Sequence, residues 1–466
     1  MSQTLTVTGQ RVLLPDSLDP RPATLTIESG KIVAIEDGWR KSDIDAGSYI
    51  LIAGLVDAHV HLNEPGRTAW EVSASSLFSH SSDLSFFHQG FWTGTRAAAA
   101  GGVTCVVDMP LNSLPPTCSS ANLDLKRAAA TNQCFTDVAF WGGVIPGNQH
   151  HLRPLVDAGV KGFKCFLIDS GVEEFPCVSE EDTQSAMEIL QDLSTVLLFH
   201  AEFDHAPSQP AQPPQPSTAY NTFLQSRPEK LEVDAISLIT RLQQRYPALR
   251  CHIVHLSAAS ALPVIRAAKA AGAKLTVETC FHYLCLAADH LPDGHPEFKC
   301  CPPIRDDTNR QLLWEALLDG TIDCVVSDHS PCVAELKHID DGDIMGAWGG
   351  ISTLGLGLSL LWTEGSKRGV SLAQILDWTS KKTAEHASLH HRKGALKVGF
   401  DADFVVWDPD AEFTVTKESL HFKNKLSAYE GLNLRGQVKQ TYVRGSLVYD
   451  STASDAFVNP PVGNLL

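Results

Sequence analysis

Eight short apolar runs recur through the middle of the chain, and each is bounded by turn or polar residues. They cover residues 51–58, 103–109, 137–141, 162–167, 196–199, 251–254, 274–278 and 322–327. Between successive runs lie stretches whose apolar residues recur at three- and four-residue spacing, the period of a helix. These stretches cover residues 93–100, 181–193, 231–244, 258–270 and 309–318, and a further one, 351–362, follows the eighth run. Because strands that alternate with helices form a parallel sheet, eight such units predict an α/β fold with a closed (β/α)₈ TIM barrel.

Both ends of the chain have a different pattern. Residues 4–50 and 395–450 alternate between apolar and polar positions and contain frequent turns, which is typical of half-buried strands. Their similar character predicts that the two ends pair into one small β-sandwich beside the barrel. We therefore expect residues 1–50 and 395–466 to form this second domain and residues 51–394 to form the barrel. Residues 206–219, rich in Pro, Gln and Ser, predict a loop after the fifth strand.

The charge of the chain narrows the range of partners. The 466 residues carry 37 Lys and Arg against 54 Asp and Glu, a formal net charge of −17, with no basic cluster. A surface of this sign does not attract nucleic acid or an anionic membrane, so we expect neither as a partner. No apolar stretch reaches membrane-spanning length, and residues 1–14 lack the pattern of a targeting peptide. The sequence therefore predicts a soluble cytoplasmic protein, in which the twelve cysteines are reduced.

The strongest chemical signal closes the first predicted barrel strand, in the segment Asp57-Ala58-His59-Val60-His61. Residues two apart in a strand face the same way, so both imidazoles project from its carboxyl end, the catalytic face of such a barrel. An isolated His-x-His can equally be two hydrogen-bonded histidines. Other strand ends, however, carry further residues of ligand type: Lys164 at the fourth, His200 at the fifth, His255 at the sixth and Asp328 at the eighth. Imidazole nitrogens and a carboxylate at one rim favour zinc or a similar divalent ion.

Lys164 is an unusual member of this set. An ammonium group has only donors, so a free lysine cannot bind a metal ion. Taken alone, Lys164 is a strand-end lysine that reaches solvent. Carbamylation by carbon dioxide would give it a carboxylate able to bridge two metal ions, and the case for that modification rests on the other ligand-type residues at the same rim.

In this order, these residues resemble the binuclear metal site of the cyclic-amide hydrolases of the amidohydrolase superfamily. That family includes dihydroorotases, dihydropyrimidinases (hydantoinases) and allantoinases. The resemblance covers nearly the whole chain, including the segment Gly399-Phe400-Asp401-Ala402-Asp403. It implies two divalent metal ions, with zinc expected: one on His59 and His61, the other on His200 and His255. By the same resemblance, N6-carboxylysine at Lys164 bridges the two ions, and Asp328 lies beside the first.

Several segments are more similar to allantoinases than to the other members: residues 61–68, 108–113, 327–332, 347–350 and 424–431. Dihydroorotases carry an arginine where this chain has Asn63, and the run Glu64-Pro65-Gly66-Arg67 is not usual in dihydropyrimidinases. The resemblance implies that the hydantoin ring of allantoin is opened to allantoate, a step of purine catabolism, by a homotetramer.

The resemblance also implies roles for individual residues. Asp328 would take a proton from the attacking hydroxide and deliver it to the departing ring nitrogen. Asn63, Arg67 and Asn112 are expected to contact the substrate. Two alternatives stay open: a hydantoinase or dihydropyrimidinase that uses the same metals, and a non-catalytic scaffold of this fold. The complete set of ligand positions argues against the scaffold.

Residues 72–89 interrupt the family pattern, in which Trp-Glu is followed directly by Gly-Phe-Trp-Thr-Gly-Thr. They separate Trp70-Glu71 from Gly90-Phe91-Trp92, are rich in Ser and Phe, and show no helical or strand period. One interpretation is a lid or specificity loop at the active-site face. The interpretation that we favour is an intron translated in frame, because Val-Ser at the start and Gln at the end can be encoded by splice-donor and splice-acceptor sequences.

Overall fold

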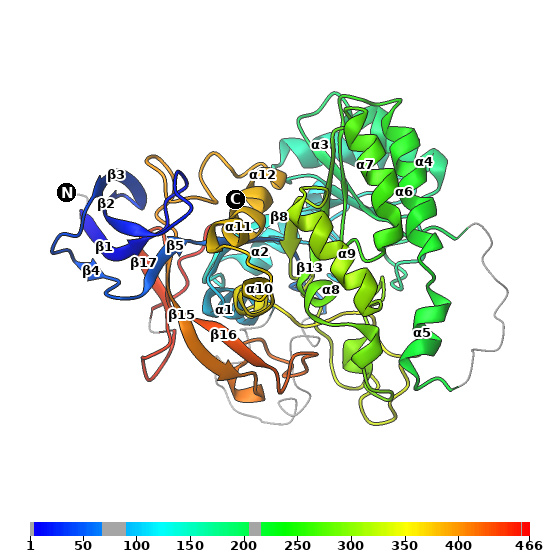
Figure 1. The fold of residues 1–466 in the computed structure, drawn as a ribbon. Coiled ribbons are helices and arrows are strands. Elements are labelled where there is room, and N and C mark those ends of the chain that lie inside the picture. Colours follow the sequence, from blue (N-terminus) through cyan, green and yellow to red (C-terminus); the bar gives the residue numbers. More distant parts are fainter. Residues whose placement is uncertain (1–3, 68–89, 205–215, 458) are drawn as a thin grey trace, which may run out of the picture.

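The computed structural model describes residues 4–67, 90–204, 216–457 and 459–466. The interrupting segment, residues 72–89, lies outside the described residues, as does most of the loop predicted at 206–219. The described elements fall into two parallel sheets with their helices and one further sheet (Figure 1).

Parallel strands occupy the middle of the chain, where the apolar runs predicted them. One sheet has the order β6-β7-β8, and the other has the order β14-β13-β12-β11-β10-β9. Their bounds are β6 (Leu55–Val60), β7 (Val103–Asp108), β8 (Asp137–Phe140), β9 (Gly142–Gly143), β10 (Phe163–Phe166), β11 (Val196–His200), β12 (Arg250–Ile253), β13 (Leu275–Cys280) and β14 (Cys324–Val326). Parallel strands with intervening helices confirm the α/β class.

The first apolar run is two strands rather than one. β5 (Ile50–Ala53) pairs with strands of the third sheet, and β6 begins after Gly54. A Cβ atom at Gly54 would lie 2.2 Å from Oγ1 of Thr104, so only glycine fits where the chain passes from one sheet to the other. Because both halves of the run are buried, alternation cannot reveal this change of sheet.

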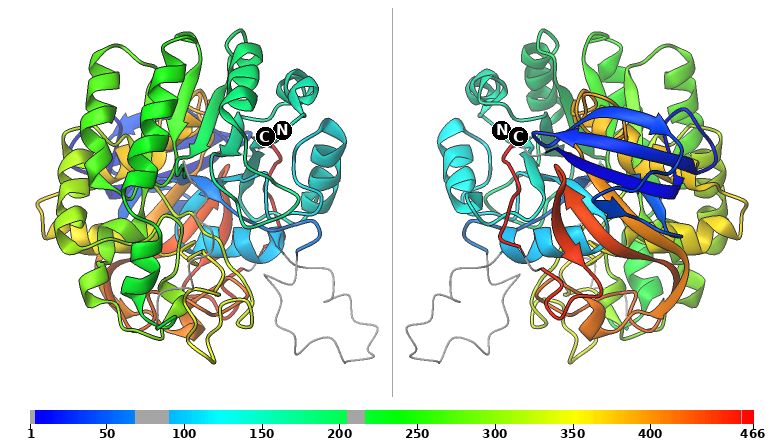
Figure 2. Two further views of the ribbon diagram at one scale, coloured as in Figure 1. Left: turned by 90° about the vertical axis from the view of Figure 1, so that its right-hand side faces the viewer. Right: turned by 90° about the vertical axis from the view of Figure 1, so that its left-hand side faces the viewer.

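Helices lie on the outside of the parallel strands (Figures 1 and 2). Five match predicted stretches: α1 (Phe91–Ala100), α4 (Glu180–Leu190), α6 (Lys230–Gln243), α7 (Leu262–Ala270) and α9 (Asp307–Leu318). Side chains cap two of them, because Ser179 accepts the N–H of Asp182 at α4 and Asp306 accepts that of Asn309 at α9. None of the described helices combines the length and apolar character needed to cross a bilayer.

Other helices were missed or displaced. The sequence did not predict α2 (Ser120–Ala130), α3 (Leu152–Asp157), α5 (Tyr220–Ser226), α8 (Phe281–Cys285), α11 (Leu372–Leu376) or α12 (Lys382–His386). α10 (Gly357–Ser366) begins later than the predicted stretch at 351–362. Gly355 has a φ of +97°, and a Cβ at Gly101 would lie 2.4 Å from its Cα, so this close contact holds the chain out of helical conformation.

Strands from both chain ends form the third sheet, with the order β17-β16-β15-β5-β1-β2-β3. Its members are β1 (Leu5–Val12), β2 (Arg21–Glu28), β3 (Lys31–Asp37), β15 (Phe404–Thr414), β16 (Asn433–Val443) and β17 (Ser446–Asp450), and β4 (Ile44–Asp45) pairs with β1. The predicted pairing of the two ends is present, because β15 runs antiparallel to β5 with Phe404 opposite Ala53. The strands form one continuous sheet with its own buried apolar cluster.

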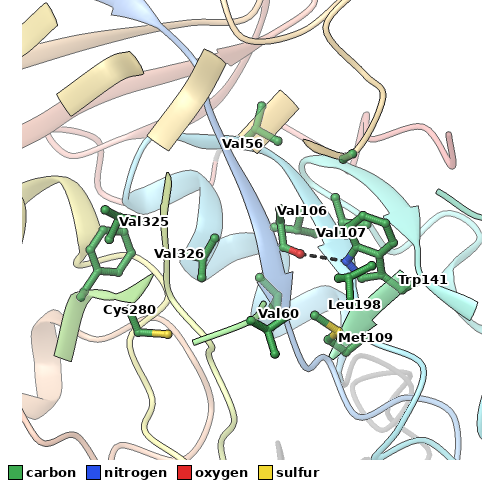
Figure 3. Close-up of a cluster of buried hydrophobic side chains, with 14 of the residues drawn as sticks. Val56, Val60, Val106, Val107, Met109, Trp141, Leu198, Cys280, Val325 and Val326 are labelled. Carbon is green, nitrogen blue, oxygen red and sulfur yellow. Dashed lines mark hydrogen bonds between the residues drawn. The ribbon is translucent and has the colours of Figure 1, made fainter. Parts of the chain in front are cut away.

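Side chains from several parallel strands meet in the main core (Figure 3). Val60 of β6, Val106 of β7, Leu198 of β11 and Val326 of β14 are all fully buried there. The indole N–H of buried Trp141 donates to the carbonyl of Ala58 at 2.8 Å, which satisfies its single polar atom. Strands of both parallel sheets thus surround one interior.

A buried charge cluster joins the parallel strands to the third sheet. The Nζ of Lys393 lies 2.5 Å from Asp137 at the start of β8, 2.6 Å from Asp403 just before β15 and 3.0 Å from Asp401. These carboxylates hold the pKa of Lys393 above its usual value, although burial opposes the charge. The cluster could collect a cation by its carboxylates alone, but the ammonium group already occupies its centre.

We expect Lys393→Met to destabilise the protein by about 3–5 kcal/mol, because it leaves the buried carboxylate of Asp403 without a cation and leaves Asp137 and Asp401 only their arginine and Lys31 partners. The midpoint of urea unfolding, followed by tryptophan fluorescence, measures the effect. Lys397→Met, at an exposed position four residues along the chain, is the control and should unfold like the wild type. Equal midpoints for all three proteins would contradict this role for Lys393.

Candidate metal centre

The ligand-type residues singled out in the sequence line one cavity of about 650 Å³. The residues are His59, His61, Lys164, His200, His255 and Asp328. His59, His61, His200, His255 and Asp328 come from the carboxyl ends of parallel strands or from the two residues that follow those ends. Lys164 differs from its prediction, because it is the second residue of β10 and is buried rather than a strand-end lysine that reaches solvent. All six are buried side chains on elements far apart in the sequence.

Three of these side chains form a compact donor set. Oδ1 of Asp328 lies 3.2 Å from Nε2 of His59 and 3.5 Å from Nε2 of His61. Ligand atoms about 2.0–2.1 Å from a tetrahedral zinc ion lie roughly 3.3 Å from one another. The residues therefore fit a divalent ion of this size in both chemistry and spacing.

The remaining members adjoin this set in the same cavity, where the ring centroids of His59 and His255 are 5.5 Å apart. The rings of His200 and His255 meet edge to face, with centroids 4.6 Å apart. The Nζ of Lys164 lies 5.0 Å from the centroid of Phe166, on whose ring His200 stacks. These side chains offer two imidazoles and one amine to a second position in the same cavity.

Burial sets the protonation of most of these groups. It lowers the pKa of His61, and it lowers the pKa of His200 and of His255 well below the ordinary histidine value. Neutral imidazole keeps a nitrogen lone pair for a metal ion. Burial also lowers the pKa of Lys164 to about 8, which increases the fraction of free amine at neutral pH.

His59 is the exception among the histidines. Burial opposes its charge, but the carboxylates of Asp328 and Glu278 prevail and raise its pKa to about 9. In turn, His59 and His61 hold the pKa of Asp328 well below its ordinary value, against the effect of burial. The carboxylates of Asp328 and Glu278 thus place negative charge beside the His-x-His pair. A metal cation bound there would take the place of the proton on His59.

Two of the candidate ligand positions have a left-handed backbone, because His255 has a φ of 39° and Asp328 a φ of 43°. Residues other than glycine rarely adopt this left-handed region, although asparagine, aspartate and histidine do so more often than the rest, and the conformation costs about 1–3 kcal/mol. Strained residues concentrate at functional sites, where the surrounding fold holds them in place. Both of these residues line the cavity.

Two buried glutamates support the histidines, and the sequence interpretation missed both. Glu278 of β13 bonds Nδ1 of His59 at 2.5 Å, and Glu202 bonds Nε2 of His200 at 2.6 Å. The only signal for Glu278 is a carboxylate within an otherwise apolar strand. Glu202 follows a strand end, where a charged residue is unremarkable.

The residues expected to contact substrate lie in different places. Asn112 lines the cavity, and its side-chain amide lies 3.3 Å from Nδ1 of His61. Arg67 instead forms an ion pair with Glu174, and neither it nor Asn63 is among the residues that line the cavity. The amide of Asn63 donates to the carbonyl of Pro331 at 3.2 Å, which ties together the loops after β6 and β14. Both side chains are thus held by protein partners.

Comparisons with known proteins agree with one another on the class of protein that this chain resembles. The model of the amidohydrolase family matches residues 50–448. The allantoinase of Saccharomyces cerevisiae is 44% identical over 474 residues, covering 99% of this chain and 98% of its own. The allantoinase of Streptomyces avermitilis is 46% identical over 469 residues, covering 99% of this chain and 98% of its own. Among solved structures, the L-hydantoinase (dihydropyrimidinase) of Arthrobacter aurescens superimposes with a TM-score of 0.87 at 25% identity and 99% coverage of both chains.

Proposed function

We propose that this chain, which belongs to the amidohydrolase family, opens the hydantoin ring of allantoin to give allantoate. The observation that carries the proposal is its identity of 44% and 46% to two allantoinases over nearly its whole length. The complete donor set in one cavity supports a catalytic protein over a scaffold that has lost its ligands.

A hydantoinase or dihydropyrimidinase is the rival closest in chemistry. Such enzymes resemble this chain in fold at 25% and 27% identity, well below the allantoinases. The ring that is opened in either case is a cyclic amide, so the metal ligands do not separate the two. The two classes would differ in the wall of the cavity that contacts the rest of the substrate.

We infer that the cavity holds two divalent metal ions, with zinc expected. His59 and His61 would hold one ion, with Asp328 beside it, and His200 and His255 would hold the other. Lys164 would join them as N6-carboxylysine. When bound, such ions supply water that is acidic enough to be a nucleophile at neutral pH and a Lewis acid for the ring carbonyl.

Asp328 is the residue placed to move the proton. Its carboxylate is ionised and lies in the cavity, so it can accept the proton of the attacking water and return it to the ring nitrogen as the carbon–nitrogen bond breaks. Asn112 is the candidate for orienting the substrate, because its Oδ1 is buried and has no hydrogen-bond partner among the described residues. Asn63 and Arg67 would act through the loops that they hold.

We infer that the two parallel sheets close into one (β/α)₈ barrel within the predicted range 51–394, which begins at β6 because β5 belongs to the third sheet. β9 directly continues β8 and pairs with β10, and at the other edge Val60 of β6 bridges to His329, just after β14. Residues 1–50 and 395–466 would then form the smaller domain, in which the strands make one continuous sheet rather than the two separate sheets of the predicted β-sandwich. We place the protein in the cytoplasm as a homotetramer, the state expected from family resemblance.

A substrate panel tests the proposed function. The purified protein, loaded with zinc, should hydrolyse allantoin with a kcat/KM well above those for dihydroorotate, dihydrouracil and hydantoin. Preference for hydantoin or dihydrouracil would show instead that the chain is a hydantoinase or dihydropyrimidinase. Hydrolysis of none of the four would contradict the proposal.

Deletion of residues 72–89 should leave the fold intact and hold or raise the activity. The segment that follows it is anchored independently, because the carboxylate of Glu64 accepts the N–H of Phe91 at 3.0 Å where α1 begins. Reads of the mature transcript give the direct test of an intron. If all reads contain these codons and the deletion abolishes turnover, the segment is a true lid and the intron interpretation is wrong.

A further inference from the structure

The carboxylates behind the two metal positions differ in their surroundings. Glu202, which bonds His200, also forms an ion pair with Arg227 at 2.5 Å. Glu278, which bonds His59, is fully buried, and no lysine or arginine of the described chain forms an ion pair with it. One carboxylate thus has a permanent cation, whereas the other has only histidines.

The remaining bonds of Glu278 hold it in place without neutralising it. Its Oε2 lies 3.1 Å from Nε2 of His252, and its Oε1 accepts the backbone N–H of His255 at 3.3 Å. Nδ1 of His252 bonds Oγ1 of Thr276 at 2.7 Å, so Nε2 is the nitrogen left for Glu278. Glu278 therefore directs a full negative charge at Nδ1 of His59 from a fixed position.

This cluster is itself a poor metal site, although His252, Glu278 and His386 bring three possible ligand atoms together. The rings of His252 and His386 stack 3.7 Å apart at only 25°. Lone pairs of nearly parallel rings lie in parallel planes and cannot converge on one ion with tetrahedral geometry. The cluster is better suited to supporting His59.

We propose that Glu278 is a positioning residue that makes the metal position on His59 and His61 the tighter of the two. Glu278 is buried without a lysine or arginine partner, and an ion bound to Nε2 of His59 supplies a lasting positive charge through the ring in place of the proton. A carboxylate that accepts the Nδ1 proton also fixes the tautomer and makes the ligand more basic. Arg227 weakens the same effect at Glu202. This inference rests on the proposed two-metal site, but not on the identity of the substrate.

Chelator titration of the zinc-loaded protein tests it, with bound zinc counted by mass spectrometry after each step. In the wild type, one ion should leave well before the other. Glu278→Gln keeps the shape but removes the charge, and should weaken the tighter position by about 10–100-fold, the usual effect of losing such a partner. Glu202→Gln should weaken the other position by a smaller factor.

A double-mutant comparison assigns the affected position. In a His255→Ala background the tighter ion remains, so Glu278→Gln should still weaken it. In a His61→Ala background that position is already lost, so Glu278→Gln should have little further effect on the ion that remains. Glu232→Gln, which removes a buried carboxylate paired with Arg305, controls for general destabilisation and should not change zinc release.

Two results would overturn the inference: unchanged zinc affinity in Glu278→Gln, or a loss confined to the position on His200 and His255. If Glu278→Gln does not fold, Glu278→Asp keeps the charge at a shorter reach and should release zinc at an intermediate chelator concentration. A protein that behaves as described but leaves allantoin intact would disprove the proposed substrate and leave this inference standing.

Discussion

Replacing Asp328 with asparagine should lower kcat/KM for allantoin by about 10²–10⁴-fold, the usual contribution of a general acid–base group. The amide has the same shape as the carboxylate but cannot accept a proton at neutral pH. Because His59 and His61 remain, the variant should keep most of its bound metal. Loss of turnover without a comparable loss of metal is the signature of a proton carrier.

Steady-state kinetics and metal analysis of the same preparation measure both quantities. Asp169→Asn is the matched control, because Asp169 also lines the cavity but lies outside the donor set. It should retain near wild-type turnover and metal. If Asp328→Asn retains turnover, the proton is carried by another group; if it loses metal and turnover together, Asp328 acts chiefly as a ligand.

Lys164→Ala should lose metal and activity together, and the metal affinity should fall by more than the roughly 10–100-fold that a supporting residue contributes. The physical reason is that a buried lysine can join the donor set only as a carbamate, so its removal deletes a shared ligand. Short carboxylic acids such as acetate or propionate should partly restore both properties, because a free carboxylate can replace the missing bridge.

The measurement is zinc content and allantoin hydrolysis, each with and without added acid. Lys161→Ala, at a partly exposed position before β10, is the control and should behave as the wild type. Full metal content in Lys164→Ala would mean that another group supplies the bridge.

Much of the fold follows from local pattern, because each parallel strand is buried and therefore continuously apolar. That rule located the strands, and with them the strand ends that carry His59, His200, His255 and Asp328. It failed at Gly54, where two buried strands of different sheets follow one another without a polar interruption. It also missed short helices such as α8, which have too few turns to show a period.

The candidate site was predictable only in part, for a similar reason. The carboxyl ends of parallel strands meet at one rim of a barrel, so the sequence alone was enough to group the ligand-type residues found at those ends. Glu278 lies within β13, and its role depends on which strand packs opposite, namely β6 with His59. The sequence could not reveal that Arg67 forms an ion pair with Glu174, because Glu174 lies on a loop 107 residues away.

The central claim is that this protein opens allantoin with two metal ions held by these side chains. The most direct test is to strip the protein of metal and to follow allantoin hydrolysis and bound zinc together as zinc is returned. We predict no turnover without metal, little at one ion per chain, and full turnover as the second ion binds. Full turnover by the stripped protein, or none by the fully loaded one, would contradict the account.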